Sequence, residues 1–517
     1  MGCGTIDNIN KNNCPDDNFS SDNSYPDKSF PPSNISIFGK ENLEKINLGK
    51  KIHYNKYYKA LIKDFHENKI IWKKAKDIFN NERYSLFSNN MSSKSIIQGS
   101  IGNCYFLSII SSLTKYPSLL YQLFHNLNIS ENGIYSIYLN IKNEISKINI
   151  DDYFPYNIRK NKTVFCKPYK NEIWVIILEK ALAKIKGSYL NIDNGSPIDV
   201  LKLLLLSSNI KNDLSYNFYS LNNEKGKNEI WNIMINKKNN KNTFMISLSK
   251  GNLKNKKQLN NLYYSIIEKH FYNINDLNEK DGKRLIRLRN PWGFNKKNKN
   301  YKINKTEGNF IIDNNEEDIG PNNDNFSSLE EGELIINYNY FIYLFEEIQI
   351  YEFKKFSINC FYNLKEDNNK VNIIKIGIKD IKINEITIDI KIIIKELLNL
   401  GESDYINVIF LIIEKENMKI LNKINYKINF NNPELKLPLF LKPNSSVDYY
   451  LCCALSCDIN QINNQIINFI FQYNDYIEII NYRQYYDDEL LFDIIKKEFK
   501  DHKIDINLLK YKKNILI

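Results

Sequence analysis

Cys104 is the residue whose surroundings suggest chemistry most directly. Gly99, Gly102 and Asn103 favour a turn, and the apolar residues of Cys104 to Leu113 (CYFLSIISSL) follow at helical spacing. This pattern predicts a helix that begins at the cysteine. A helix dipole stabilises a thiolate at its N-terminus, and a nearby imidazole can hold a thiolate and imidazolium pair. We therefore expect Cys104 to be an activated nucleophile.

Acyl transfer by such a cysteine also needs oxyanion donors and a group that orients the imidazole. Gln98 precedes the cysteine by six residues across a glycine-containing turn, so its amide can donate alongside the Cys104 N–H. Asn290 follows a predicted strand in the run RNPWG and can accept the imidazole N–H. The chain has five histidines, at positions 53, 66, 125, 270 and 502, from which the base must come.

The elements that must position these groups form a mixed pattern up to about residue 355. A second helix is predicted over Glu172 to Lys186, ended by Gly187. Strand-like alternation occurs at Gly133 to Ile141, Ser146 to Ile150, Thr243 to Leu248, His270 to Ile274 and Arg284 to Leu288. Helices first and strands later indicate an α+β fold.

From residue 356 the pattern changes to short β-rich runs separated by polar turns. These runs are Val371 to Ile378, Ile386 to Ile394, Tyr405 to Ile413, Ile424 to Phe430, Val447 to Leu455, Ile466 to Tyr473 and Tyr476 to Ile480. They predict an antiparallel β-sandwich, and residues 488–515 are predicted to add a helix. No EF-hand loop, phosphate loop or internal repeat is found.

Several motifs, in order along the chain, resemble those of the calpains, which are papain-like cysteine endopeptidases. They are QGSIGNCYFLSIISSL from Gln98, IDDYFP from Ile150, EIWVIILEKALAKIKGSY from Glu172, HFYNI from His270, LIRLRNPWG from Leu285 and LEEGELIINYNYF from Leu329. The resemblance covers about residues 50–355. It implies a two-lobed protease core, with lobes of about 41–200 and 201–355, followed by a C2-like β-sandwich over 356–517.

The resemblance also implies a role for each site residue. Cys104 is the nucleophile, His270 the base and Asn290 its orienting partner, while Gln98 holds the oxyanion and Trp292 shields the histidine from water. A second alignment remains open, because LYYSI from Leu262 also resembles the family's histidine motif and would make the chain an inactive protease. Since histidine is scarce here, His270 is the preferred base.

Some residues depart from the family pattern. Asn103 stands for the usual Asp, Tyr105 for Trp and Lys269 for the Gly before the histidine. Calpain cores bind two calcium ions, yet no Asp or Glu lies between Arg83 and Cys104, and Lys296 stands where the second calcium loop has a Glu.

The second calcium loop keeps Glu331 and Glu333 as candidate ligands, or these two carboxylates belong to a solvated acidic turn. We therefore expect no required cofactor and a weakened calcium response.

Composition limits the other classes of protein. With 517 residues, 43% of them hydrophobic, the chain can bury the cores of several domains, and no apolar run approaches the 18–20 residues of a membrane span. Eight scattered cysteines make no disulfide framework, so an intracellular, cytoplasmic location is expected. The net charge of +11 is spread along the chain without a basic stripe, and no nucleic-acid partner is expected.

Residues 1–40 are rich in Asn, Asp, Ser and Pro and are predicted to form a flexible tail. Gly2 and Cys3 suggest myristoylation and palmitoylation, which together anchor a protein to membranes, although Ile6 stands where the motif has Ser or Thr. The predicted function is cleavage of protein substrates. The alternative is an inactive calpain-like scaffold at a membrane or the cytoskeleton.

Overall fold

The chain folds into two units, each described by itself. The computed structural model describes residues 26–48, 56–80, 82–88, 91–207, 210–221, 226–252, 266–280, 282–293, 310–312, 332–363, 371–377, 386–394, 405–414, 417–429, 434–441, 448–457, 466–473, 478–482, 494 and 497. Unit 1 comprises the described residues of 1–115, 128–204 and 214–353, and unit 2 those of 116–127, 205–213 and 354–517.

The first part of unit 1, up to residue 204, is mainly helical. Its helices are α1 (Asn34–Phe38), α2 (Lys40–Asn47), α3 (Lys56–His66), α4 (Ala75–Ile78), η3 (Ser93–Ser95), α5 (Cys104–Leu113), α7 (Trp174–Lys186), η4 (Leu190–Ile192) and α8 (Pro197–Leu204). Its strands are β1 (Ile70–Lys74), β2 (Ile134–Ile141), β3 (Glu144–Asp151), β4 (Tyr153–Asn157) and β5 (Lys162–Thr163). Every residue of α5 is buried, because this helix is apolar around its whole circumference.

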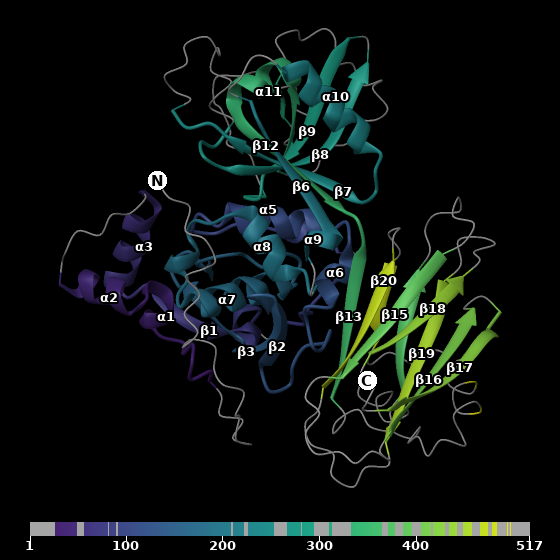
Figure 1. The fold of residues 1–517 in the computed structure, drawn as a ribbon. Coiled ribbons are helices and arrows are strands. Elements are labelled where there is room, and N and C mark those ends of the chain that lie inside the picture. The colour runs from purple at the N-terminus through teal and green to yellow at the C-terminus, as the bar shows by residue number, and fades with distance from the viewer. Residues whose placement is uncertain are drawn as a thin grey trace. The chain divides into compact units, whose positions relative to one another are not determined.

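The second part of unit 1 is a seven-stranded sheet with the order β10-β11-β9-β8-β7-β12-β6. Figure 1 labels its strands β6, β7, β8, β9 and β12. Its strands are β6 (Leu214–Ser220), β7 (Thr243–Ser249), β8 (Phe271–Lys280), β9 (Lys283–Arg289), β10 (Phe310–Ile312), β11 (Glu333–Asn337) and β12 (Phe345–Phe353). All neighbouring strands are antiparallel except β10 and β11. Helices α10 (Lys227–Lys238) and α11 (Tyr338–Leu344) contact the sheet and contribute aromatic side chains to its core.

The two parts of unit 1 meet where α5 contacts β8. The Asn273 side-chain amide donates hydrogen bonds to the Ser108 carbonyl and the Ser112 hydroxyl of α5, both at 2.7 Å. The backbone N–H of Gln98 donates to the Pro291 carbonyl at 3.0 Å. These bonds connect the turn before α5 and the helix itself to the strands that follow far along the chain.

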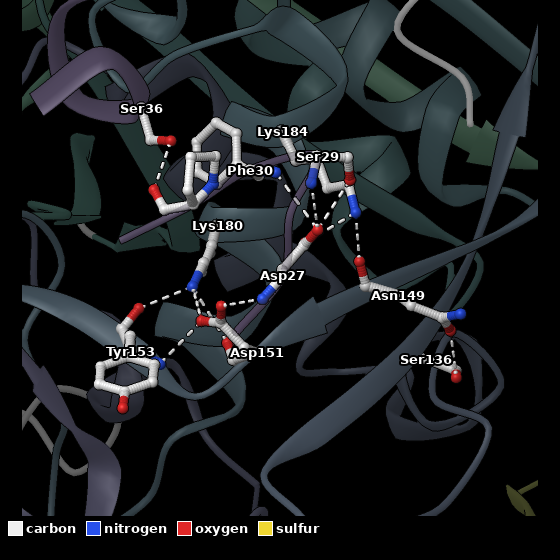
Figure 2. A network of polar contacts seen from close by, with 11 residues as sticks. Asp27, Ser29, Phe30, Ser36, Ser136, Asn149, Asp151, Tyr153, Lys180 and Lys184 are labelled. Carbon is white, nitrogen blue, oxygen red and sulfur yellow. Dashed lines mark hydrogen bonds and ion pairs between the residues drawn. The ribbon is translucent and has the colours of Figure 1, made fainter. Parts of the chain in front are cut away.

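Residues 26–38 are packed against unit 1, which differs from the flexible tail predicted for residues 1–40. The Asp27 carboxylate pairs with Lys184 of α7 at 2.7 Å, and the Asp27 N–H donates to Asp151 at 2.8 Å (Figure 2). Phe30 is buried, and its ring lies 6.0 Å from that of Tyr189. Polar composition suggested disorder, but these polar groups find buried partners that are distant in the sequence.

Lys180 lies at the centre of the same polar network (Figure 2). Its fully buried ammonium pairs with the Asp151 carboxylate and donates to the Tyr153 carbonyl at 2.7 Å. Burial lowers the pKa of Lys180, while the Asp151 charge opposes this shift. Buried charges are tolerated only when they are paired in this way, so α7, β3 and β4 are held in one arrangement.

Unit 2 contains two antiparallel sheets. One has the order β13-β20-β15-β18 and the other β17-β16-β19-β14-β21. The strands are β13 (Phe356–Asn363), β14 (Val371–Gly377), β15 (Ile386–Ile394), β16 (Tyr405–Glu414), β17 (Lys419–Asn429), β18 (Glu434–Leu441), β19 (Asp448–Cys457), β20 (Ile466–Tyr473) and β21 (Glu478–Tyr482). Two short helices, α6 (Pro117–Tyr121) and α9 (Ile210–Asp213), belong to this unit.

Seven of these nine strands coincide with the β-rich runs predicted from the sequence, while β13 and β18 were not predicted. Pro438 argues against a strand, but β18 is an edge strand of its sheet, where a missing N–H is tolerated. The C2-like sandwich stays a prediction, and apart from residues 494 and 497 the expected helix over 488–515 lies outside the described residues. Among the described residues, no helix is both long and apolar enough to cross a membrane.

Candidate active site

Cys104 is the first residue of α5, as predicted, but its side chain is buried and 7% of the residue is exposed. Burial raises the pKa of the Cys104 thiol to about 11, and this outweighs the N–H groups of Phe271 and Tyr105, which face the sulfur and favour the thiolate. The helix dipole predicted a shift in the opposite direction. The dipole contributes a partial charge, whereas burial penalises the full charge of the thiolate, so the thiol is neutral at pH 7 in this arrangement.

His270 and Asn290 lie side by side at the ends of neighbouring strands. His270 precedes β8 and Asn290 follows β9, and the antiparallel pairing of the two strands brings them together. The His270 Nε2 donates to the Asn290 Oδ1 at 2.9 Å, and both residues are buried. The Phe271 N–H that faces the Cys104 sulfur belongs to the residue directly after the histidine.

The surroundings of His270 restrict its imidazole. Its backbone N–H donates to the Ser249 hydroxyl at 2.9 Å, and the Ser249 N–H donates to the His270 carbonyl at 3.0 Å. The Trp292 ring centroid lies 5.5 Å from that of the imidazole in an edge-to-face arrangement, and the shielding role of Trp292 stays a prediction. Sequence reasoning missed Ser249, because a serine at the end of a strand carries no special signal.

Gln98 lies just before α5, close to the carbonyl of its own turn. Its side-chain Nε2 donates to the Ile101 carbonyl at 2.6 Å, and its Oε1 is buried without a hydrogen-bond partner among the described residues. The turn passes close to the segment around Phe165, because a Cβ built on Gly99 would lie 1.8 Å from the Phe165 carbonyl oxygen. Only glycine fits at position 99, because the backbone around Phe165 occupies the place of a side chain.

A buried carboxylate, which sequence reasoning missed, is hydrogen-bonded to Asn103, the residue before Cys104. The Asn103 amide donates to the Glu179 Oε1 at 2.7 Å, and the Cys166 N–H donates to the Glu179 Oε2 at 2.9 Å. Burial raises the pKa of Glu179 to about 7. The sequence carried one signal for a buried carboxylate here. Glu179 lies on the same face of α7 as the apolar residues Ile176 and Ala183.

The candidate calcium residues behave differently. Glu331 lies outside the described residues, whereas Glu333 is buried in β11. Glu333 accepts a hydrogen bond from Asn275 at 2.7 Å and lies 3.8 Å from the Arg287 guanidinium. The Glu333 carboxylate is thus already engaged by an amide and a cation, and the described residues contain no group of three or more His, Cys, Asp or Glu side chains placed to hold a metal ion. Binding that involves Glu331 stays a prediction.

The departures from the expected motif are accommodated locally. Tyr105 is buried, and its hydroxyl donates to the Ile192 carbonyl at 3.2 Å. Lys269 adopts a left-handed conformation with φ of 52°, and its ammonium pairs with Glu346 at 3.0 Å. Leu262, Gly2 and Cys3 lie outside the described residues.

The described residues thus include a cysteine at a helix N-terminus and a hydrogen-bonded histidine–asparagine pair, which are residue types that cysteine proteases use. The sequence profile described as calpain family cysteine protease matches residues 25–352, which is more than half of the chain. The chain belongs to the calpain family of cysteine proteases.

Part of this chain is similar in sequence to individual calpains from plants and mouse. The chain is 29% identical over 218 residues to the calpain-type cysteine protease DEK1 of Zea mays and 28% identical over 219 residues to DEK1 of Arabidopsis thaliana. Each match covers 42% of this chain and 10% of the relative. Calpain-5 of Mus musculus is 32% identical over 140 residues, covering 25% of this chain and 21% of the relative. The chain therefore matches about a tenth of the plant relatives' length.

Proposed function

We propose that this protein is a cysteine endopeptidase that hydrolyses peptide bonds of other proteins. The observation that carries the proposal is the 2.9 Å hydrogen bond between His270 and Asn290. The residue directly after this histidine, Phe271, has its N–H facing the Cys104 sulfur. Family membership supports the same reaction class. The substrate is an extended segment of a protein chain.

The reaction begins with Cys104. Its sulfur attacks the scissile carbonyl carbon while the thiol proton moves to Nδ1 of His270, the ring nitrogen that Asn290 does not hold. The Cys104 N–H and the second N–H of the Gln98 amide stabilise the oxyanion. The imidazolium then protonates the leaving amine, and a thioester remains on Cys104. Water attacks the thioester, gives its proton to His270 and releases the carboxylic acid with the regenerated thiol.

Because burial raises the pKa of the Cys104 thiol, the proposed route has His270 take the thiol proton as a general base during the attack. A neutral thiol beside an oriented imidazole still supplies this route. Trp292 keeps water away from the His270 and Asn290 hydrogen bond in the proposal, since its ring edge faces the imidazole.

The test compares purified wild type, Cys104→Ala and His270→Ala on an unstructured protein, with and without calcium. We expect wild type to cleave and both variants to lose cleavage, and an epoxide thiol-protease inhibitor to label Cys104. If wild type neither cleaves nor is labelled under any condition, the enzyme proposal is wrong and the scaffold alternative takes its place. Cleavage that persists in His270→Ala contradicts the role of that residue.

Membrane anchoring through Gly2 and Cys3 is a second part of the proposal, based on the sequence alone. Wild type expressed in cells should be recovered with membranes, and Gly2→Ala should move it to the supernatant. A Gly2→Ala protein that remains with membranes contradicts acylation of Gly2.

A further inference from the structure

Glu179 of α7 connects two parts of the candidate active site that are distant in sequence. Its Oε1 accepts from the side chain of Asn103, the residue before the nucleophile. Its Oε2 accepts from the backbone of Cys166, in the segment that runs alongside the Gln98 turn. Glu179 as a residue is 1% exposed, so these bonds are made away from bulk water.

The first connection acts on the start of α5. Asn103 is the N-cap residue of this helix, and its carbonyl accepts the first intrahelical N–H groups, from Phe106 and Leu107. Its side chain makes no capping bond to the helix, because its amide is directed to Glu179 instead. The position of Asn103, and with it the direction of the Cys104 side chain, is therefore set by a bond to another helix.

The second connection acts on the Gln98 turn. The Ser100 N–H donates to the Val164 carbonyl at 3.1 Å, and the Lys167 N–H donates to the Ile97 carbonyl at 3.0 Å. The residues on either side of Cys166 thus hold the residues on either side of Gln98. By holding the Cys166 N–H, Glu179 holds this segment against the turn that carries the oxyanion donor.

We propose that Glu179 is a positioning residue that holds both the nucleophile Cys104 and the oxyanion donor Gln98 in their working places. The catalytic meaning of this inference rests on the proposed protease function. The positioning itself is a property of the fold and is measurable without proteolysis. The titratable groups that face Glu179 are the Cys166 thiol and the Tyr189 phenol, and burial keeps both neutral.

Both hydrogen-bond partners of Glu179 are donors, so substitutions that exchange donors and acceptors test its role. In Glu179→Gln one of the two carboxylate oxygens becomes an NH₂ group, which then faces either the Asn103 amide or the Cys166 N–H, both of which are donors. Rotating the Asn103 amide relieves one clash but moves its NH₂ group to where its oxygen now lies, buried without a partner among the described residues. In Asn103→Asp two carboxylates face each other at the distance of a hydrogen bond, which is unfavourable unless one is protonated.

The double variant Asn103→Asp with Glu179→Gln reverses the pair. The new amide donates to the new carboxylate, and its oxygen accepts the Cys166 N–H. We therefore expect this exchange to restore the arrangement that each single change disturbs. Glu172→Gln is the matched control, because Glu172 is also buried next to α7 but accepts bonds from Ser95 and Trp174.

The primary measurement is the rate at which iodoacetamide modifies Cys104 in the full chain, followed by mass spectrometry of its peptide. The His270→Ala background removes the contribution of the imidazole. We expect each single variant to raise the rate about tenfold, since loss of the buried hydrogen bond between residues 103 and 179 loosens the α5 terminus. The double variant should return to within threefold of its parent, and Glu172→Gln should stay within twofold.

In the chain that retains His270, the single variants should lower kcat about tenfold and leave KM unchanged. If Glu179→Gln melts at the parent temperature and labels at the parent rate, the inference is wrong, and it is also wrong if the double variant behaves no better than the singles. If labelling follows the expected order but no chain cleaves protein, the inference holds and the proposed function fails.

Discussion

The Asn290 side-chain oxygen accepts two hydrogen bonds, from the His270 Nε2 at 2.9 Å and from the Trp292 N–H at 3.0 Å. The bond from the Trp292 N–H fixes the orientation of the Asn290 amide. The Asn290 oxygen in turn fixes the plane of the His270 imidazole and keeps the proton on Nε2. The arrangement joins the base to the end of β9 through a residue with no measurable exposure.

Replacing Asn290 should therefore impair catalysis more than binding. For Asn290→Ala we expect kcat to fall about a hundredfold with KM changed little, because the imidazole loses the partner that orients it. Steady-state kinetics on a peptide substrate checks this, with Asn275→Ala as a control in β8. An unchanged kcat would show that His270 does not need Asn290.

The raised pKa of Cys104 predicts a particular pH profile for its reactivity. In wild type, the rate of iodoacetamide modification should rise about tenfold per pH unit from pH 7 to 10, since the thiolate fraction grows below a pKa of about 11. Peptide mass spectrometry at each pH supplies the rate. A plateau between pH 5 and 8 that disappears in His270→Ala would instead indicate a preformed thiolate and imidazolium pair.

Lys269 should be replaceable by glycine with little cost. Its left-handed backbone costs a lysine about 1 kcal/mol that glycine does not lose, and the exposed pair with Glu346 contributes at most about 1 kcal/mol. Since these effects nearly cancel, Lys269→Gly should melt within a few degrees of wild type and keep kcat/KM within twofold.

Lys269→Ala is the control for the glycine variant, because it loses the ion pair and keeps the backbone strain. Its melting temperature should lie below that of Lys269→Gly. A large gain in kcat/KM for both variants would mean that the lysine obstructs substrate, against its observed pairing with Glu346.

The Asp27 and Lys184 pair should make the attachment of residues 26–38 sensitive to acid. Burial is the largest single influence on Asp27 and opposes its ionisation, but the Lys184 charge and the hydrogen bonds from Lys184 and Ser29 together lower the pKa of Asp27 below its usual value. Because this folded-state pKa is below the unfolded one, the pair stabilises the fold above pH 4, and that stabilisation is lost as the pH falls through the folded pKa.

For Asp27→Asn we expect a loss of about 2–3 kcal/mol in the free energy of unfolding at pH 7, with the difference from wild type shrinking below pH 4. Thermal melts across pH 3–7 measure it. Glu41→Gln breaks an exposed pair with Lys45 and should leave the melting curve close to that of wild type. An Asp27→Asn chain as stable as wild type at pH 7 would contradict the anchoring role.

Glu179 should produce the opposite pH trend. Its folded pKa of about 7 lies above the model-peptide value of 4.5, so the folded state binds the proton more tightly than the unfolded state. Stability from this group is complete below pH 4.5 and declines by about 3 kcal/mol as the pH rises to 7. Glu179→Gln removes this decline, so its melting temperature should gain on that of wild type between pH 5 and 7. A constant difference between the two would show that Glu179 does not titrate there.

The sequence alone determined the local elements that depend on short-range patterns. The helix over Cys104–Leu113 has the predicted bounds, because a glycine-rich turn is followed by continuous apolar residues. The helix that ends at Gly187 stops where a left-handed residue is needed, at φ of 87°. The motif residues also sufficed to predict the calpain family.

Residue spacing left open whether His270 or Leu262 occupies the position of the catalytic base next to Asn290. The antiparallel pairing of β8 with β9 brings His270 to Asn290. The register of strand pairing decides which residues lie opposite each other, and the number of residues between them does not reveal that register. Likewise, polar composition suggested a free tail up to residue 40, but Asp27 has its partner 157 positions away.

The protonation of the site was decided by tertiary structure alone. A helix start predicted a low pKa for Cys104, yet burial raises it, and burial also raises the pKa of Glu179, which contacts the neighbouring Asn103, to about 7. Helix dipoles follow from local sequence, whereas removal from water depends on what the rest of the chain packs around a residue. Sequence therefore determined which groups are present, and the packing of unit 1 decided their charge.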